Sequence, residues 1–126
     1  MENEHGRSLE VLALLADLRP MQALLANLRE HDIRVDVATD LAEARGAFFG
    51  SGGHDCLVLA PDVGPGLAAK VLDSLRAVDP ELPAATFGPG CRDGDRRSRT
   101  AVLAGFHPSS RAGAGALLRF LAGIRR

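Results

Sequence analysis

The chain has 126 residues, carries a formal net charge of −1 and is 46% hydrophobic, which is enough apolar material for the core of one domain. It has no run of about eighteen apolar residues, and its N-terminus, MENEHGRSLE, is polar instead of a basic stub followed by an apolar block. We therefore expect a soluble, cytoplasmic protein that does not enter a membrane, with a single domain over residues 1–126 and a disordered N-terminus over residues 1–7.

The first half of the chain alternates between strand-like and helix-like patterns. LEVLALLA at residues 9–16 is almost continuously apolar, which predicts a separate buried element before Pro20. Proline suits the first turn of a helix, and apolar residues then recur at helical spacing: Met21, Leu24, Leu25 and Leu28. IRVDVA at residues 33–38 alternates like a strand, and Asp40 with Glu43 forms a capping box for a helix over LAEARGAFF.

The second half continues this rhythm up to the fourth strand. CLVLA at residues 56–60 predicts a buried strand, and LPAATF at residues 82–87 predicts a short one. Between them, GLAAKVLDSLRAV at residues 66–78 predicts a helix with one apolar side: Leu67, Val71, Leu75 and Val78.

The last part of the chain predicts two more helices around one strand. A helix is expected from about Arg96 to Ala104, GFH at residues 105–107 is the expected fifth strand, and Ser109 or Ser110 caps a final helix that ends at Ile124. Five strands alternating with five helices indicate an α/β fold. We expect a doubly wound parallel sheet with helices on both faces and right-handed crossovers.

In an open parallel sheet, ligands bind beyond the carboxyl ends of the strands, where the strand order reverses. Asp17 and Leu18 follow the first predicted strand, residues 60–62 end the third, residues 86–88 end the fourth, and His107 ends the fifth. These positions are the first candidates for a functional site.

Over essentially its whole length, the sequence resembles the receiver domains of bacterial two-component response regulators. LLANLREHDIRVDVATDLAEAR looks like the family's first helix, second strand and second helix, and LDSLRAVDPELPA looks like its third helix leading into the fourth strand. The resemblance implies a flavodoxin-like, three-layer αβα fold with strand order 2-1-3-4-5. It also implies a role in phosphorelay signal transduction.

The resemblance further implies a known constellation of site residues. In active members, an acidic pair after the first strand and a phosphoacceptor aspartate after the third hold magnesium, while a Thr or Ser and a Lys bind the phosphoryl oxygens. A hard cation needs carboxylate oxygens, the aspartate is the nucleophile, and the lysine balances the phosphoryl charge. In this chain only Asp17 keeps the family's residue type, and the other four positions hold Leu18, Ala60, Gly88 and His107.

These departures predict a degenerate pseudo-receiver that lacks the phosphoacceptor aspartate, with no catalytic residue, no metal and no cofactor. One alternative places the phosphoacceptor at Asp62, with Asp17 and Asp62 sharing a magnesium ion. Asp62 lies two residues past Ala60, however, which is far outside the tolerance of about half an ångström that such a site needs. We therefore expect Asp62 to be a turn residue. A slip of two residues would present Thr86 at the fourth strand in place of Gly88.

His107 occupies the position of the family's lysine and keeps the proline that follows it. We expect this histidine to be a hydrogen-bonded replacement for the lysine. The alternative is a pH-sensitive edge in which His107 pairs with Asp17.

Charge is distributed unevenly along the chain. Residues 1–91 carry 7 basic and 14 acidic side chains, whereas residues 92–126 carry 8 arginines and 2 aspartates. We expect the last two helices and the fifth strand to bind an acidic protein partner or a second copy of the chain, through five arginines: Arg96, Arg97, Arg99, Arg111 and Arg119. Nucleic-acid binding is the alternative, but the chain has no recognition motif, Trp or Tyr to support it.

Two further expectations concern the cysteines and the ends of the chain. Cys56 and Cys91 fall at opposite ends of a parallel sheet, so no disulfide should join them. The sequence stops where a receiver domain stops, which predicts either a stand-alone protein or part of a longer regulator without an effector domain in this chain.

Overall fold

Five parallel strands form one sheet in the computed structural model, which describes residues 8–88, 100–103 and 105–124. The strands are β1 (Glu10–Leu14), β2 (Arg34–Ala38), β3 (Cys56–Leu59), β4 (Ala84–Thr86) and β5 (Thr100–Val102), and they lie in the order β2-β1-β3-β4-β5. Every neighbouring pair is parallel. The predicted doubly wound α/β fold with strand order 2-1-3-4-5 is confirmed.

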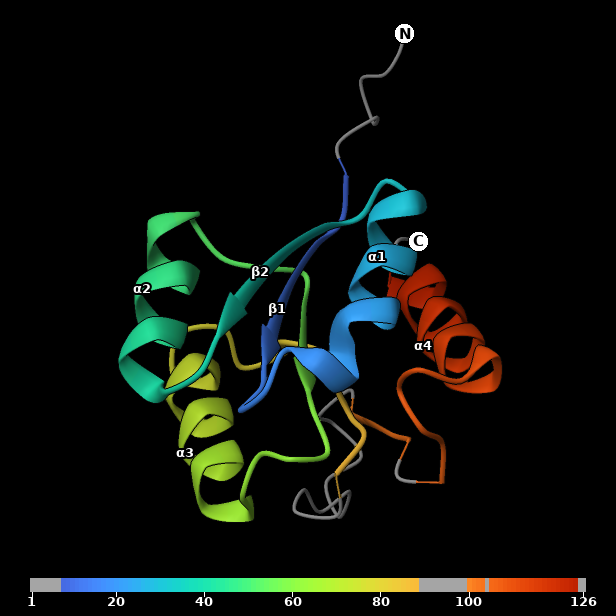
Figure 1. Ribbon diagram of the computed structural model, residues 1–126. Coiled ribbons are helices and arrows are strands. Elements are labelled where there is room, and N and C mark those ends of the chain that lie inside the picture. Colours follow the sequence, from blue (N-terminus) through green and yellow to red (C-terminus); the bar gives the residue numbers. More distant parts are fainter. Residues whose placement is uncertain (1–7, 89–99, 104, 125–126) are drawn as a thin grey trace, which may run out of the picture.

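Helices cover both faces of the sheet. A short 3-10 turn at Arg19–Met21 leads into the first of the α-helices in the described ranges: α1 (Gln22–Glu30), α2 (Leu41–Gly50), α3 (Pro65–Arg76) and α4 (Arg111–Ile124). Helices α2 and α3 contact each other on one face, and α1 and α4 contact each other on the opposite face (Figure 1). The sheet is therefore the middle of three layers.

The apolar runs become the central strands because they are covered from both sides. Residues 11–14 of β1 have no exposed surface, and the four residues of β3 are at most 1% exposed. A parallel strand between two helical layers has no polar face, so its sequence is continuously apolar. Strand β2 lies at the edge of the sheet, and Ala38 is its one fully buried residue.

The side chains predicted to cap the N-termini of helices α2 and α4 do so in the structure. Asp40 caps α2 by accepting a 2.8 Å hydrogen bond from the Glu43 amide. The Glu43 carboxylate accepts in return from the amide of Thr39 at 2.8 Å, one residue before the cap. Ser110, and not Ser109, caps α4, since its Oγ accepts from the Gly113 amide at 3.0 Å. Each of these bonds satisfies an amide that the first turn of a helix leaves free.

Two predictions about the elements are wrong. The fifth strand is Thr100–Val102, so these residues do not belong to the helix expected from about Arg96 to Ala104, and residues 105–107 form a turn instead of the expected strand. Residues 96–99 of that expected helix lie outside the described residues. β-Branched Thr100 and Val102 suit a strand, whereas the Phe106 amide bonds back to the Leu103 carbonyl at 3.0 Å. Val78 lies beyond the end of α3 and is 60% exposed, so it is not part of that helix's apolar side.

Some expectations fall on parts of the chain outside the described residues. These are the disorder of residues 1–7, the placement of Cys91, and the partner contacts of Arg96, Arg97 and Arg99. Cys56 is described and is completely buried in β3, where burial raises the pKa of its thiol. No helix within the described ranges is long and apolar enough to cross a membrane.

Candidate functional site

The carboxyl ends of β1, β3 and β4 meet at one edge of the sheet, as the strand order requires. Backbone hydrogen bonds continue just past the strands, from the Ala60 amide to the Leu14 carbonyl at 3.0 Å and from the Phe87 amide to the Leu59 carbonyl at 2.9 Å. The loops that carry the predicted site residues Asp17, Ala60, Asp62 and Gly88 therefore start from neighbouring strands.

Ala60 follows β3 directly and closes the end of that strand. Its amide bonds to β1, its carbonyl accepts from the Val63 amide at 3.3 Å, and the residue is 1% exposed. A buried methyl group has no lone pair to offer a phosphoryl group, so nothing at this position can act as the nucleophile.

Asp62 links the loop after β3 to the loop after β1 by hydrogen bonds. Its Oδ1 accepts from the Ala16 amide at 3.2 Å and its Oδ2 accepts from the Asp17 amide at 2.9 Å. One carboxylate therefore holds the loop after β1 to the loop after β3, with the added strength of a charged acceptor. The sequence predicted a turn residue here but contained no sign of this bridge, which joins residues 45 and 46 positions apart.

Asp17 is paired with an arginine two residues further along the chain. The Arg19 Nη2 donates to Oδ2 at 2.9 Å, its Nε lies 3.3 Å from both oxygens, and its backbone amide donates to Oδ1 at 3.0 Å. These hydrogen bonds hold the pKa of the Asp17 carboxyl below its usual range. Leu18, in the position of the family's second acid, is 44% exposed.

The two carboxylates are poorly suited to hold a magnesium ion. The Asp17 carboxylate is already paired with the Arg19 guanidinium, whose positive charge would repel a cation, and each oxygen of Asp62 already accepts from a backbone amide. Within the described ranges, no group of three or more His, Cys, Asp or Glu side chains is placed to hold a metal.

At the end of β4, the Thr86 hydroxyl is bonded to the backbone two residues further along the chain. The Thr86 residue is 2% exposed, and its Oγ1 lies 3.1 Å from both the amide and the carbonyl oxygen of Gly88. The Thr86 hydroxyl, which the alternative alignment would place at the functional site, is thus hydrogen-bonded to the chain's own backbone. A Cβ at Gly88 would lie 3.4 Å from both the Ala60 carbonyl oxygen and Pro61 Cα, so β4 runs close against the end of β3.

His107 lies in the turn before α4, five residues after the end of β5. Its Nδ1 accepts from the Ser109 amide at 3.1 Å and lies 2.6 Å from Ser109 Oγ. Among the described residues, the hydrogen-bond partner of the Asp17 carboxylate is Arg19 and not His107.

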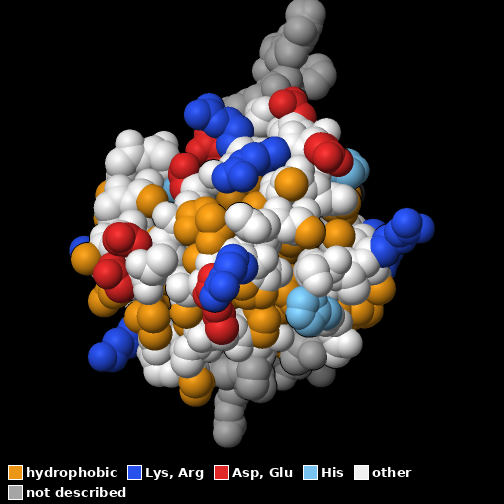
Figure 2. All heavy atoms as spheres, in the orientation of Figure 1, with side chains coloured by type: hydrophobic (Ala, Val, Ile, Leu, Met, Phe, Trp, Pro, Cys, Tyr) orange, Lys and Arg blue, Asp and Glu red, His pale blue; other side chains and the backbone are white. Residues whose placement is uncertain are grey.

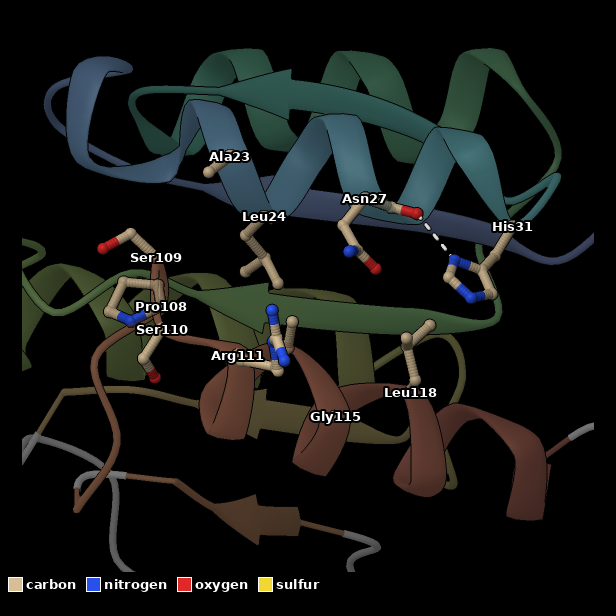
Figure 3. Close-up of a pocket in the computed structure, with 11 residues that line it drawn as sticks. Ala23, Leu24, Asn27, His31, Pro108, Ser109, Ser110, Arg111, Gly115 and Leu118 are labelled. Carbon is tan, nitrogen blue, oxygen red and sulfur yellow. Dashed lines mark hydrogen bonds between the residues drawn. The ribbon is translucent and has the colours of Figure 1, made fainter.

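A groove of about 490 Å³ runs between α1 and α4. Leu24 and Asn27 of α1 point toward α4, and Arg111 and Leu118 of α4 point back toward α1 (Figure 3). Asn27 Oδ1 is buried there without a hydrogen-bond partner in the described part of the chain. Arg119, the other described arginine of the predicted partner surface, is exposed, and its Nη1 lies 3.6 Å from where a Cβ on Gly115 would sit.

A histidine that the sequence did not single out makes a buried side-chain contact with an aspartate. The His54 side chain is 1% exposed, and its Nε2 lies 2.8 Å from Asp36 Oδ2. Its ring stacks on Phe48 of α2 with 5.8 Å between the ring centres. The histidine follows GSGG in the chain and resembles an ordinary turn residue, so no local pattern revealed this pair.

No protein-family model and no curated protein matches the sequence. Solved structures do resemble the fold. The chemotaxis response regulator CheY4 of Vibrio cholerae is 15% identical, with 94% of this chain and 99% of that chain covered and a TM-score of 0.66. A response regulator protein from Burkholderia multivorans is 17% identical, with 95% and 97% covered and a TM-score of 0.57. The chain thus has the fold of a response-regulator receiver domain.

Proposed function

We propose that this protein is a phosphorylation-independent receiver-like module, which acts in signal transduction by binding a protein partner and has no enzymatic activity of its own. The observation that carries the proposal is Ala60. The position directly after β3, where the receiver architecture places its nucleophile, holds a buried methyl group.

The surrounding residues support the same conclusion. Asp62 is the other carboxylate in this loop, and each of its oxygens accepts a hydrogen bond, from the amide of Ala16 or of Asp17. Phosphorylation of Asp62 would disrupt this bridge between two loops. Leu18 and Gly88 supply neither a metal ligand nor a hydroxyl.

The decisive experiment is an amide NMR titration of the ¹⁵N-labelled protein with magnesium and beryllofluoride, a mimic of the phosphoryl group. We expect the signals of Ala60, Asp62 and Gly88 to stay in place. An active receiver in the same buffer is the positive control. Clustered shifts that disappear in an Asp62→Asn variant would overturn the proposal and assign a shifted phosphoacceptor.

The groove between α1 and α4 supports a role in partner binding. Arg111 and Arg119 have no carboxylate partner in the described part of the chain; Arg111 lines the groove, and Arg119 is exposed about two turns further along α4. An acidic segment fits this surface.

Charge reversal at Arg119 is expected to weaken binding of an acidic partner by about tenfold, because attraction is replaced by repulsion at the edge of the interface. A glutamate-rich helical peptide, titrated at low ionic strength into wild-type protein and an Arg119→Glu variant, measures the effect. Arg34→Glu, with the same change of charge on β2, should bind the peptide like the wild type. Equal affinity of all three proteins would contradict the assignment of the surface.

A further inference from the structure

The free edge of β2 has outward-facing backbone groups. The Arg34 amide bonds to the Leu9 carbonyl at 2.9 Å, and the Ala38 carbonyl accepts from the Leu15 amide at 3.0 Å. In a parallel pair, alternate residues bond to the same neighbour. Residues 34, 36 and 38 therefore bond to β1, and the amides and carbonyls of Val35 and Val37 point away from the sheet.

The chain itself satisfies the outward amides at both ends of this edge. The Ile33 amide donates to the Leu28 carbonyl at 3.0 Å, and the Thr39 amide donates to the Glu43 carboxylate at 2.8 Å. Neither Val35 nor Val37 has such a bond to another described residue. The open part of the edge is thus short and begins and ends at defined residues.

The edge lies open between the two helical layers. Figure 1 looks onto β2, with α2 and α3 on one side of it and α1 and α4 on the other. Figure 2, in the same orientation, shows hydrophobic side chains interspersed with both signs of charge on this face. A hollow of about 350 Å³ follows the edge and is lined by Arg29 and by residues 32–36.

The side chains of β2 alternate between charge and aliphatic groups, in the order RVDVA. Arg34 is exposed, and the Asp36 side chain is 56% exposed with Oδ2 bonded to His54. Val37 is 39% exposed. Natural edge strands are commonly protected by charged side chains, proline or a bulge. Strand β2 has no proline and pairs with β1 without a break, and its two charges are opposite in sign, so they complement each other in an antiparallel pair.

We propose that this edge binds a second copy of the chain, whose β2 adds antiparallel about a two-fold axis at Val35 to give one continuous sheet across the dimer. In this register, Val35 lies opposite its symmetry mate, with two backbone hydrogen bonds between them. Arg34 of each copy lies opposite Asp36 of the other copy, so the two-fold axis produces two such pairs. Opposite charges that face each other across two strands stabilise the pairing.

Charge selects this register over its nearest competitor. A two-fold axis at Asp36 would also pair the outward groups of Val35 with those of Val37, but it would place two Asp36 carboxylates directly opposite each other. Like charges in that position are destabilising. Of these two registers, only the one centred at Val35 therefore brings opposite charges together. The proposal is independent of the partner groove between α1 and α4.

Sedimentation equilibrium of the full chain tests the dimer. We expect concentration-dependent dimerisation of the wild type and about tenfold weaker association of Arg34→Glu, because two attractive pairs become repulsive. Val35→Pro removes an outward backbone donor without touching the bonds to β1 and should weaken dimerisation as well. Lys70→Glu, which makes the same change of charge at an exposed position of α3, is the matched control and should dimerise normally. A monomeric wild type, or dimers insensitive to both β2 variants, would overturn the proposal.

Disulfide trapping tests the register. Directly opposed residues of an antiparallel hydrogen-bonded pair have Cα atoms about 5.5 Å apart, within the range for a disulfide. Val35→Cys, in a Cys91→Ser background, should therefore cross-link to itself on oxidation. Val37→Cys should not, because its copies would lie about 13 Å apart along the strands. Cys56 is buried and does not interfere. Cross-linking at position 37 and not at 35 would overturn the proposal.

Discussion

Alanine in place of Gly113 is expected to lower the free energy of unfolding by about 3 kcal/mol. Gly113 lies in the first turn of α4, and a Cβ there would be 2.3 Å from the His107 carbonyl oxygen and 3.1 Å from Ser110 Oγ. The first contact is with backbone, so no side-chain rotation relieves it. To make room, α4 would have to move away from the turn that carries His107, and the Ser110 cap would be disturbed.

Gly115 provides a matched control on the same helix. A Cβ at Gly115 meets one atom within 4 Å, Arg119 Nη1 at 3.6 Å, which is the end of a flexible side chain. Gly115→Ala should therefore stabilise the protein by about 0.5–1 kcal/mol, the usual gain from removing a helical glycine. Denaturant unfolding of both variants measures the difference. Equal stability of the two variants would show that α4 does not pack tightly against the His107 turn.

The fold could be predicted because its signals are local. Continuous apolar runs in β1 and β3 follow from burial between two helical layers, and the helix starts follow from Pro20, Asp40 and Ser110. The fifth strand was misplaced because GFH and TAV are equally short. Pairing with β4 selects TAV, and this contact joins residues distant in sequence.

The positions of the candidate residues relative to the strands were predictable, but their hydrogen bonds were not. The sequence placed Ala60 as the last residue of the third strand, and the structure ends β3 one residue earlier, at Leu59. The sequence did not show that Asp62 bridges to the amides of Ala16 and Asp17, or that His54 reaches Asp36, because both contacts depend on how β1, β2 and β3 lie side by side. The pairing of Asp17 with Arg19 spans two residues and was open to prediction, since a charge pair at that spacing is visible in the sequence.

An aspartate introduced at position 60 is expected to destabilise the protein by about 3 kcal/mol at neutral pH, because an ionised carboxylate would replace a methyl group that is 1% exposed. Burial beside Asp62 disfavours the charged form and raises the pKa of the new carboxyl in the folded state. Its penalty is then full above the raised pKa and declines as the pH falls toward the unfolded value of about 4. Denaturant unfolding of Ala60→Asp between pH 7 and about pH 4 measures this dependence.

Ala60→Asn is the control, because it has nearly the same shape without the charge, so its cost should not vary with pH in this way. The aspartate variant should also remain silent toward magnesium and beryllofluoride in the NMR titration. A nucleophile alone does not rebuild the site, since Leu18 supplies no second metal ligand, Gly88 supplies no hydroxyl, and the Asp17 carboxylate is held by Arg19. If Ala60→Asp were stable and bound beryllofluoride, then the edge would still be a working phosphoryl site that lacks one residue, and the proposed loss of phosphoryl chemistry would be limited to that single position.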